Sequence, residues 1–191
     1  MGVVLAGGRS LRMGTDKALL AWHGRPLIEH QIALLQQAGF ADVRVSGRVS
    51  GLRPGCAGVA DAVAGAGPLG GLAGVATGLA DGTDLLVVPV DMPLLTGTLL
   101  RRLWREQPRA ATVRFAGTVL PMRWRLDAGS RARLWELLGN AARAGRSLRA
   151  LQQVCGVAEI ALAGPEADLL ADCNDPAAWD ALRRRADSCQ P

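Results

Sequence analysis

The sequence contains no tyrosine, and only one of its 22 basic residues, Lys17, is a lysine. It has no run of about 18 apolar residues, which a membrane-spanning helix would need. It also lacks the charged and then apolar opening of a secretion signal. Its four cysteines form no Cys-x-x-Cys pair, which argues against a zinc site or a disulfide framework. These absences predict a cytoplasmic protein that has no membrane partner.

The composition that remains is typical of a globular chain. Of the 191 residues, 49% are hydrophobic and 20% are charged, and this length suits a single domain over residues 1–191. Alanine and glycine are abundant, so the rarity of lysine indicates a coding bias toward arginine. A lysine that remains at position 17 therefore indicates a site that needs a compact ammonium group. The alternative is that Lys17 was left by chance.

Positive charge is concentrated in the middle of the chain. Residues 101–149 contain 12 arginines and only three acidic residues. This block predicts that an anionic ligand is bound locally, although most of these arginines are expected on solvated helix surfaces. An RNA-binding protein is a further class to consider. The sequence shows neither an aromatic RNA-binding strand motif nor a basic helix with base-reading residues, so no nucleic-acid partner is expected.

Apolar runs and helical periodicity alternate along the chain. Strands are predicted over residues 2–6, near 59, and over 43–46, 85–90, 111–115, 118–126 and 157–162. Helices are predicted over residues 26–37, 69–80, 98–107, 130–144 and 147–154, and from 176 onward. Pro89 places its strand at a sheet edge or marks the strand end. The pattern predicts an α/β fold, a Rossmann-like three-layer sandwich with a mostly parallel sheet covered by helices on both faces.

The clearest chemical motif follows the first strand. Leu5-Ala6-Gly7-Gly8 leaves this strand and leads to Arg12 and Lys17. Glycines at a strand exit let backbone N–H groups approach an anion closely, and the two cations add positive charge. The spacing is neither that of a Walker A loop nor that of a dinucleotide fingerprint. The motif therefore predicts a phosphate-binding loop of another type.

The stretch LAGGRSLRMGTDKALL resembles the signature of the molybdenum cofactor guanylyltransferases (MobA), which have a nucleotidyltransferase fold. The resemblance continues through GAGPLGGLAG at 65–74, VVPVDMP at 87–93 and DCNDPAAWDAL at 172–182. It implies an enzyme that transfers GMP from GTP to molybdopterin, uses Mg²⁺ and releases pyrophosphate. It also implies that the product passes to a molybdoenzyme or a cofactor-delivery protein.

The resemblance also implies roles for particular residues. Nucleotide binding falls to Leu5, Ala6, Gly7, Gly8, Lys17, Ser46, Asp61 and Asp91. The implied catalytic residues are Arg12, Lys17 and Asp91, and the implied metal ligands are Asp91 and Asn174. Acceptor binding falls to Arg146, Arg149 and Asn174.

Two of these carboxylates also fit their roles on chemical grounds. Asp91 directly follows an apolar strand, where open α/β sheets bind ligands, and carboxylate oxygen suits Mg²⁺. The alternative for Asp91 is a helix N-cap. The Asp61 carboxylate could accept from both N1–H and N2–H of guanine, and the alternative is an ordinary turn residue.

The sequence departs from the family pattern at Ser46 and Asp172, where asparagines are usual, and at Leu120, where the family often has histidine. Alternatives are a CTP-dependent molybdopterin cytidylyltransferase, a sugar-phosphate nucleotidyltransferase and a catalytically weak molybdopterin carrier. Gly7 favours a purine nucleotide, because the loop of the cytidylyltransferases usually reads Leu-Ala-Ala-Gly.

No acid or cysteine completes a metal site with His23 and His30, so both are expected to be packing or surface residues. The tryptophans expected in the core are Trp104, Trp124, Trp135 and Trp179, with stacking on a pterin as the alternative for Trp124.

Overall fold

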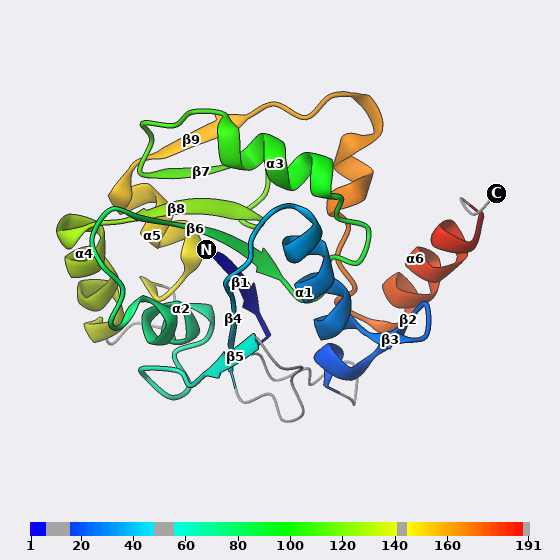
Figure 1. Ribbon diagram of the computed structural model, residues 1–191, viewed down its shortest axis with the longest axis horizontal. Coiled ribbons are helices and arrows are strands. Elements are labelled where there is room, and N and C mark those ends of the chain that lie inside the picture. Colours follow the sequence, from blue (N-terminus) through cyan, green and yellow to red (C-terminus); the bar gives the residue numbers. More distant parts are fainter. Residues whose placement is uncertain (7–15, 48–55, 141–144, 189–191) are drawn as a thin grey trace.

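The computed structural model describes residues 1–6, 16–47, 56–140 and 145–188. In this part of the chain a seven-stranded sheet has the order β5-β4-β1-β6-β8-β7-β9 (Figure 1). The strands are β1 (Gly2–Leu5), β4 (Val43–Ser46), β5 (Cys56–Val59), β6 (Thr83–Pro89), β7 (Thr112–Phe115), β8 (Met122–Leu126) and β9 (Val157–Ile160). Only the two pairings of β8 are antiparallel, so the predicted mostly parallel sheet is confirmed.

Helices cover both faces of this sheet, as the predicted three-layer sandwich requires. Helices α1 (Leu27–Gln37), α3 (Gly97–Arg105) and α6 (Pro176–Ser188) contribute to one core, and α2 (Pro68–Ala76), α4 (Ala128–Gly139) and α5 (Leu148–Cys155) contribute to the other. Along β1, Val3 packs in the second core and Val4 in the first, because successive strand residues point to opposite faces. None of the helices described is long and apolar enough to cross a membrane.

Several predicted boundaries differ from the structure. The predicted helix over 69–80 ends at Ala76, because Thr77 leaves helical geometry and Gly78 takes a positive φ of 79°. The helix expected to reach 144 ends at Gly139, where Asn140 is extended, and residues 141–144 lie outside the described part. Pro89 ends β6, which lies between β1 and β8, so the edge-strand alternative is wrong.

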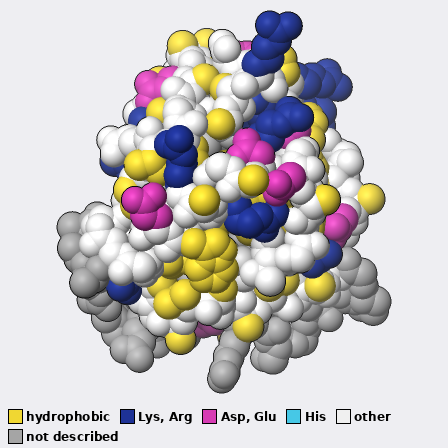
Figure 2. Space-filling view, turned by 90° about the vertical axis from the view of Figure 1, so that its left-hand side faces the viewer, with side chains coloured by type: hydrophobic (Ala, Val, Ile, Leu, Met, Phe, Trp, Pro, Cys, Tyr) yellow, Lys and Arg dark blue, Asp and Glu magenta, His cyan; other side chains and the backbone are white. Residues whose placement is uncertain are grey.

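The tryptophans separate into core and surface residues. Trp124 is fully buried, Trp179 is nearly so, and Trp104 is partly buried against the core. Trp135 of α4 is 45% exposed, so its predicted place in the core is wrong. Figure 2 shows apolar side chains at the surface on the side of the molecule that carries α4. Trp135 shares its helix with buried leucines but lies on the side that no further layer covers.

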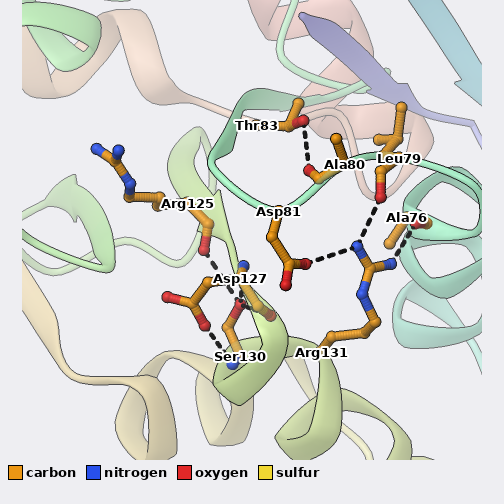
Figure 3. Close-up of polar contacts among 9 residues, drawn as sticks. All are labelled: Ala76, Leu79, Ala80, Asp81, Thr83, Arg125, Asp127, Ser130 and Arg131. Carbon is orange, nitrogen blue, oxygen red and sulfur yellow. Dashed lines mark hydrogen bonds and ion pairs between the residues drawn. The ribbon is translucent and has the colours of Figure 1, made fainter.

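Arg131 of α4 joins the end of α2 to the turn that precedes β6 (Figure 3). Its Nη1 donates to the Ala76 carbonyl at 2.6 Å, and its Nη2 donates to the Leu79 carbonyl at 2.7 Å. Nη2 also lies 3.2 Å from Asp81 Oδ1. The last carbonyls of a helix lack helical partners and carry partial negative charge, so a guanidinium stabilises them.

We expect Arg131→Met to lower the free energy of unfolding by about 1–3 kcal/mol, because it removes charge-assisted bonds to two carbonyls. Urea denaturation measures this change. Arg125→Met is the matched control. The Arg125 side chain makes one long ion pair, with Nη1 3.8 Å from Asp84 Oδ2, and is directed away from the other side chains in Figure 3. An exposed pair of this kind contributes little. Equal losses in the two variants would contradict the role of Arg131.

Candidate active site

Three segments that are distant in the sequence meet beyond the carboxyl ends of β1 and β6. Lys17 Nζ donates to Asp91 Oδ2 at 2.9 Å and to Asn174 Oδ1 at 2.6 Å. Strand β4 pairs with one edge of β1, and β6, which comes later in the chain, pairs with the other edge. The order of strands in the sheet therefore changes direction at β1. Ligands of open α/β sheets bind at such a change of direction.

Local structure positions each member of this group. Lys17 begins a short 3₁₀ helix (Lys17–Leu19), and the Asp16 carboxylate caps it by accepting from Ala18 N at 3.0 Å. Asp91 follows β6, and its carbonyl accepts from Cys173 N at 2.9 Å, which fixes the segment that carries Asn174. The N-cap of the next helix, α3, is Thr96, so the N-cap alternative for Asp91 is wrong.

Lys17 and Asp91 are partly shielded from solvent, whereas Asn174 and the neighbouring Asp172 are exposed. The Lys17 and Asp91 side chains are only 14% and 21% exposed. Burial, and then the Asp91 charge, raise the pKa of the nearby Asp172 carboxyl, while Lys17 and Asn174 oppose this change. Burial raises the pKa of the Cys173 thiol to about 11, so this thiol is neutral near pH 7. The Asp91 and Asp172 carboxyl groups thus lie near one ammonium, that of Lys17.

The oxygen atoms of this group fit Mg²⁺. Carboxylate and amide oxygens are hard ligands, and Lys17 already shows that Asp91 and Asn174 direct oxygens toward one cationic group. The described residues contain no cluster of three or more histidine, cysteine, aspartate or glutamate side chains that could hold a metal. Mg²⁺ is commonly held by one or two carboxylates together with substrate phosphates. The geometry thus suits a metal that arrives with a nucleotide.

A second group lies at the ends of β4 and β5. Ser46 ends β4 and is buried, and a Cβ on Gly71 of α2 would lie 2.6 Å from its Oγ and 3.3 Å from Asp61 Oδ1. Only glycine permits this close approach of α2. Asp61 Oδ1 is buried and has no hydrogen-bond donor among the described residues, and burial raises the pKa of this carboxyl. A buried acceptor without a partner is costly, so a ligand that donates here would be favoured.

The remaining candidate residues are less closely grouped. Leu5 ends β1, and Ala6 N donates to the Ser46 carbonyl at 3.3 Å, so the loop starts between the two groups. Gly7, Gly8 and Arg12 lie outside the described residues.

Arg146 and Arg149 are not brought to the Lys17 group by any hydrogen bond in the described part of the chain. Arg146 Nε instead donates to the Asn140 carbonyl at 2.5 Å, and Arg149 is exposed on α5. Their predicted role in acceptor binding stays a prediction.

Sequence reasoning missed the residues that hold the segment after Asp91. Gln31 Nε2 of α1 donates to the Met92 carbonyl at 2.7 Å, and the His30 ring Nε2 lies 3.0 Å from the Pro93 carbonyl. His30 therefore packs against this segment, as the packing alternative predicted, but its contact with the Pro93 carbonyl was not expected. A signal for Gln31 exists in the sequence, because it interrupts the apolar face formed by Ile28 and Ile32.

An open α/β sheet with an ammonium and oxygen ligands at its change of direction suits the binding of phosphates. The family match and the relatives given next make the protein a nucleotidyltransferase. Residues 2–157 match the family described as MobA-like NTP transferase domain. The chain belongs to this family.

Individual relatives agree with this assignment. The chain is 50% identical to a molybdenum cofactor guanylyltransferase of Xanthomonas euvesicatoria pv. vesicatoria, over 95% of this chain and 93% of that protein. It shares its fold with the molybdopterin-guanine dinucleotide biosynthesis protein A of Archaeoglobus fulgidus, with a TM-score of 0.76, 18% identity and coverage of 98% and 100%. A 2-C-methyl-D-erythritol 4-phosphate cytidylyltransferase of Thermus thermophilus also shares it, with a TM-score of 0.66, 18% identity and coverage of 97% and 98%.

Proposed function

We propose that this chain is a molybdenum cofactor guanylyltransferase, which transfers GMP from GTP to molybdopterin and releases pyrophosphate. The observation that carries this function is the 50% identity to the Xanthomonas guanylyltransferase over nearly all of both chains. That match extends over nearly the whole chain, so the aligned region includes Lys17, Asp91 and Asn174, the residues that meet at the site.

The reaction forms one bond to phosphorus and breaks another. An oxygen of the acceptor phosphate attacks the α-phosphorus of GTP in line, while the bond from this phosphorus to the bridging oxygen breaks. The electron pair of that bond leaves with pyrophosphate. A phosphate monoester is already anionic near pH 7, so no strong general base is required. Catalysis then depends on positioning and on charge neutralisation by Lys17 and Arg12.

Asp91 and Asn174 are the residues that would hold Mg²⁺. When bound, this ion would neutralise negative charge on the phosphates. Lys17 donates to both of these oxygens and has one further N–H group that can donate to a phosphate. Leu5, Ala6, Gly7 and Gly8 supply the backbone of the nucleotide loop, and the partly exposed Arg146 and the exposed Arg149 are proposed for the acceptor phosphate.

Turnover of the purified protein with molybdopterin, Mg²⁺ and each of GTP, CTP and ATP tests this function. We expect pyrophosphate release and a guanine dinucleotide product with GTP. Preferred use of CTP would establish the cytidylyltransferase alternative, whose fold is shared with the Thermus cytidylyltransferase. Binding of molybdopterin without turnover would establish the carrier alternative. Transfer to a molybdoenzyme or delivery protein and a cytoplasmic location stay predictions.

We expect Asp61→Ala to reduce the preference for GTP over CTP and ATP by about 10–100-fold, since a hydrogen bond to a charged group contributes about 1.5–3 kcal/mol. The reason is that Asp61 Oδ1 has no hydrogen-bond donor among the described residues, and the family resemblance assigns this carboxylate to the N–H groups of guanine. A competition binding assay with the three nucleotides measures the preference. Asp180→Ala, on the exposed side of α6, is the control. An unchanged preference would make Asp61 an ordinary turn residue.

A further inference from the structure

The main chain that carries Asp91 is held at three successive carbonyl oxygens. The Asp91 carbonyl accepts from Cys173 N at 2.9 Å, and the Met92 carbonyl accepts from Gln31 Nε2 at 2.7 Å. The Pro93 carbonyl lies 3.0 Å from His30 Nε2. Two of these three contacts come from adjacent side chains of α1, a helix that contributes no residue to the site itself.

Gln31 is a costly residue for its position. It is fully buried on the apolar face of α1, next to Ile28 and Ile32. Its Oε1 is also buried, and no described residue donates to it. A buried acceptor without a donor destabilises a fold. The Met92 carbonyl also accepts from Leu95 N at 3.3 Å, so it would keep one donor if an apolar side chain of similar length replaced Gln31. Stability alone therefore does not account for a glutamine here.

His30 makes a parallel contact with the next carbonyl. Burial lowers the pKa of this histidine, so the neutral ring predominates near pH 7. A neutral ring donates to Pro93 only when its proton is on Nε2. Together, the two side chains hold the Met92 and Pro93 carbonyls from one direction, while Cys173 holds Asp91 from another.

We propose that Gln31 is a positioning residue, supported by His30, that fixes the turn at 91–93 so that the Asp91 carboxylate is directed to the cation site. Asp91 lies outside any helix or strand, so its direction depends on such contacts. The inference rests on the proposed role of Asp91 as a metal ligand. Residues that orient a ligand from behind typically change metal affinity or activity by about 10–100-fold when they are replaced.

The decisive variant is Gln31→Met, which keeps the length and apolar volume but removes both the donor and the unpartnered oxygen. We expect the melting temperature to fall by less than about 3 °C, or to rise. We expect kcat to fall about tenfold, with KM for GTP within about twofold of wild type. We also expect the affinity for Mn²⁺ in the presence of GTP, measured by electron paramagnetic resonance, to fall about tenfold.

His30→Phe provides an independent second variant. It keeps a ring against Trp22, which lies 6.3 Å from the His30 ring, but removes the contact with Pro93. A smaller loss of Mn²⁺ affinity in the same direction is expected. Leu35→Val is the control, because Leu35 is buried on the same helix and packs against Gly2 at the other end of β1. It should lower the melting temperature without changing Mn²⁺ affinity.

Wild-type Mn²⁺ affinity and kcat in both Gln31→Met and His30→Phe would overturn the positioning role. The positioning role would also be overturned if Leu35→Val lost as much activity as Gln31→Met for the same fall in melting temperature. Failure of the proposed function gives a different result, since wild-type protein would then bind no Mn²⁺ with GTP or make no dinucleotide. The two failures are therefore distinguished by the wild-type measurement.

Discussion

Replacing Lys17 with alanine is expected to lower kcat/KM for GMP transfer by about 10²–10³-fold, the effect of losing one preorganised electrostatic donor. The Lys17 ammonium is shared between Asp91 and Asn174, at 2.9 and 2.6 Å. Its removal leaves the Asp91 carboxylate without this counterion and leaves negative charge on the triphosphate uncompensated. Steady-state kinetics with GTP varied at saturating acceptor measure the loss.

Lys17→Arg separates charge from shape. A guanidinium keeps the charge but is broad and planar, whereas the ammonium is a compact point charge between two oxygens. Its activity is expected between those of wild type and Lys17→Ala. Arg105→Ala is the control for loss of a cation, since Arg105 is exposed and lines a hollow with Met1, at the opposite end of β1. Activity within about twofold of wild type in both Lys17 variants would contradict the assignment.

The central strands of the sheet were well predicted from sequence. β4 has the predicted bounds, 43–46, with Val43 and Val45 buried. β6 differs from its prediction by a residue or two, because its buried residues form a continuous apolar run. The hairpin of β2 (Ala21–Trp22) and β3 (Arg25–Pro26) was not predicted, since strands of two residues have no periodicity to detect. Trp135 shows a further limit: helical spacing indicates which residues share a face, not which face another layer covers.

The candidate site was predictable only in part, for a related reason. Asp91 follows from its place after an apolar strand, and Lys17 from its rarity. Asn174 was predicted only through the family resemblance, because its position 2.6 Å from Lys17 depends on how the chain returns to Asp91, which no local pattern encodes. Gln31 is similar, because a polar residue in an apolar stripe indicates a buried partner but does not indicate that this partner is the Met92 carbonyl.

Asp91→Asn is expected to reduce kcat by about 10²–10³-fold, equivalent to about 3–4 kcal/mol, while GTP affinity changes by less than about fivefold. Asparagine keeps the size of the side chain and one oxygen that accepts from Lys17, so the nucleotide site keeps its shape. It removes the negative charge that favours a divalent cation, and with it the neutralisation of charge on the transferring phosphate.

The measurement that separates these effects is kcat as a function of Mg²⁺ concentration, together with GTP binding in the absence of acceptor. Raising Mg²⁺ should restore part of the lost turnover in Asp91→Asn, because the weakened site is then filled by mass action. Asp84→Asn is the matched control, since Asp84 lies on the same strand, β6, toward its opposite end. It should match wild type at every Mg²⁺ concentration. If Asp91→Asn turned over at the wild-type rate at limiting Mg²⁺, Asp91 would not be a metal ligand. The role of the Asp91 carboxylate would then be limited to its ion pair with Lys17.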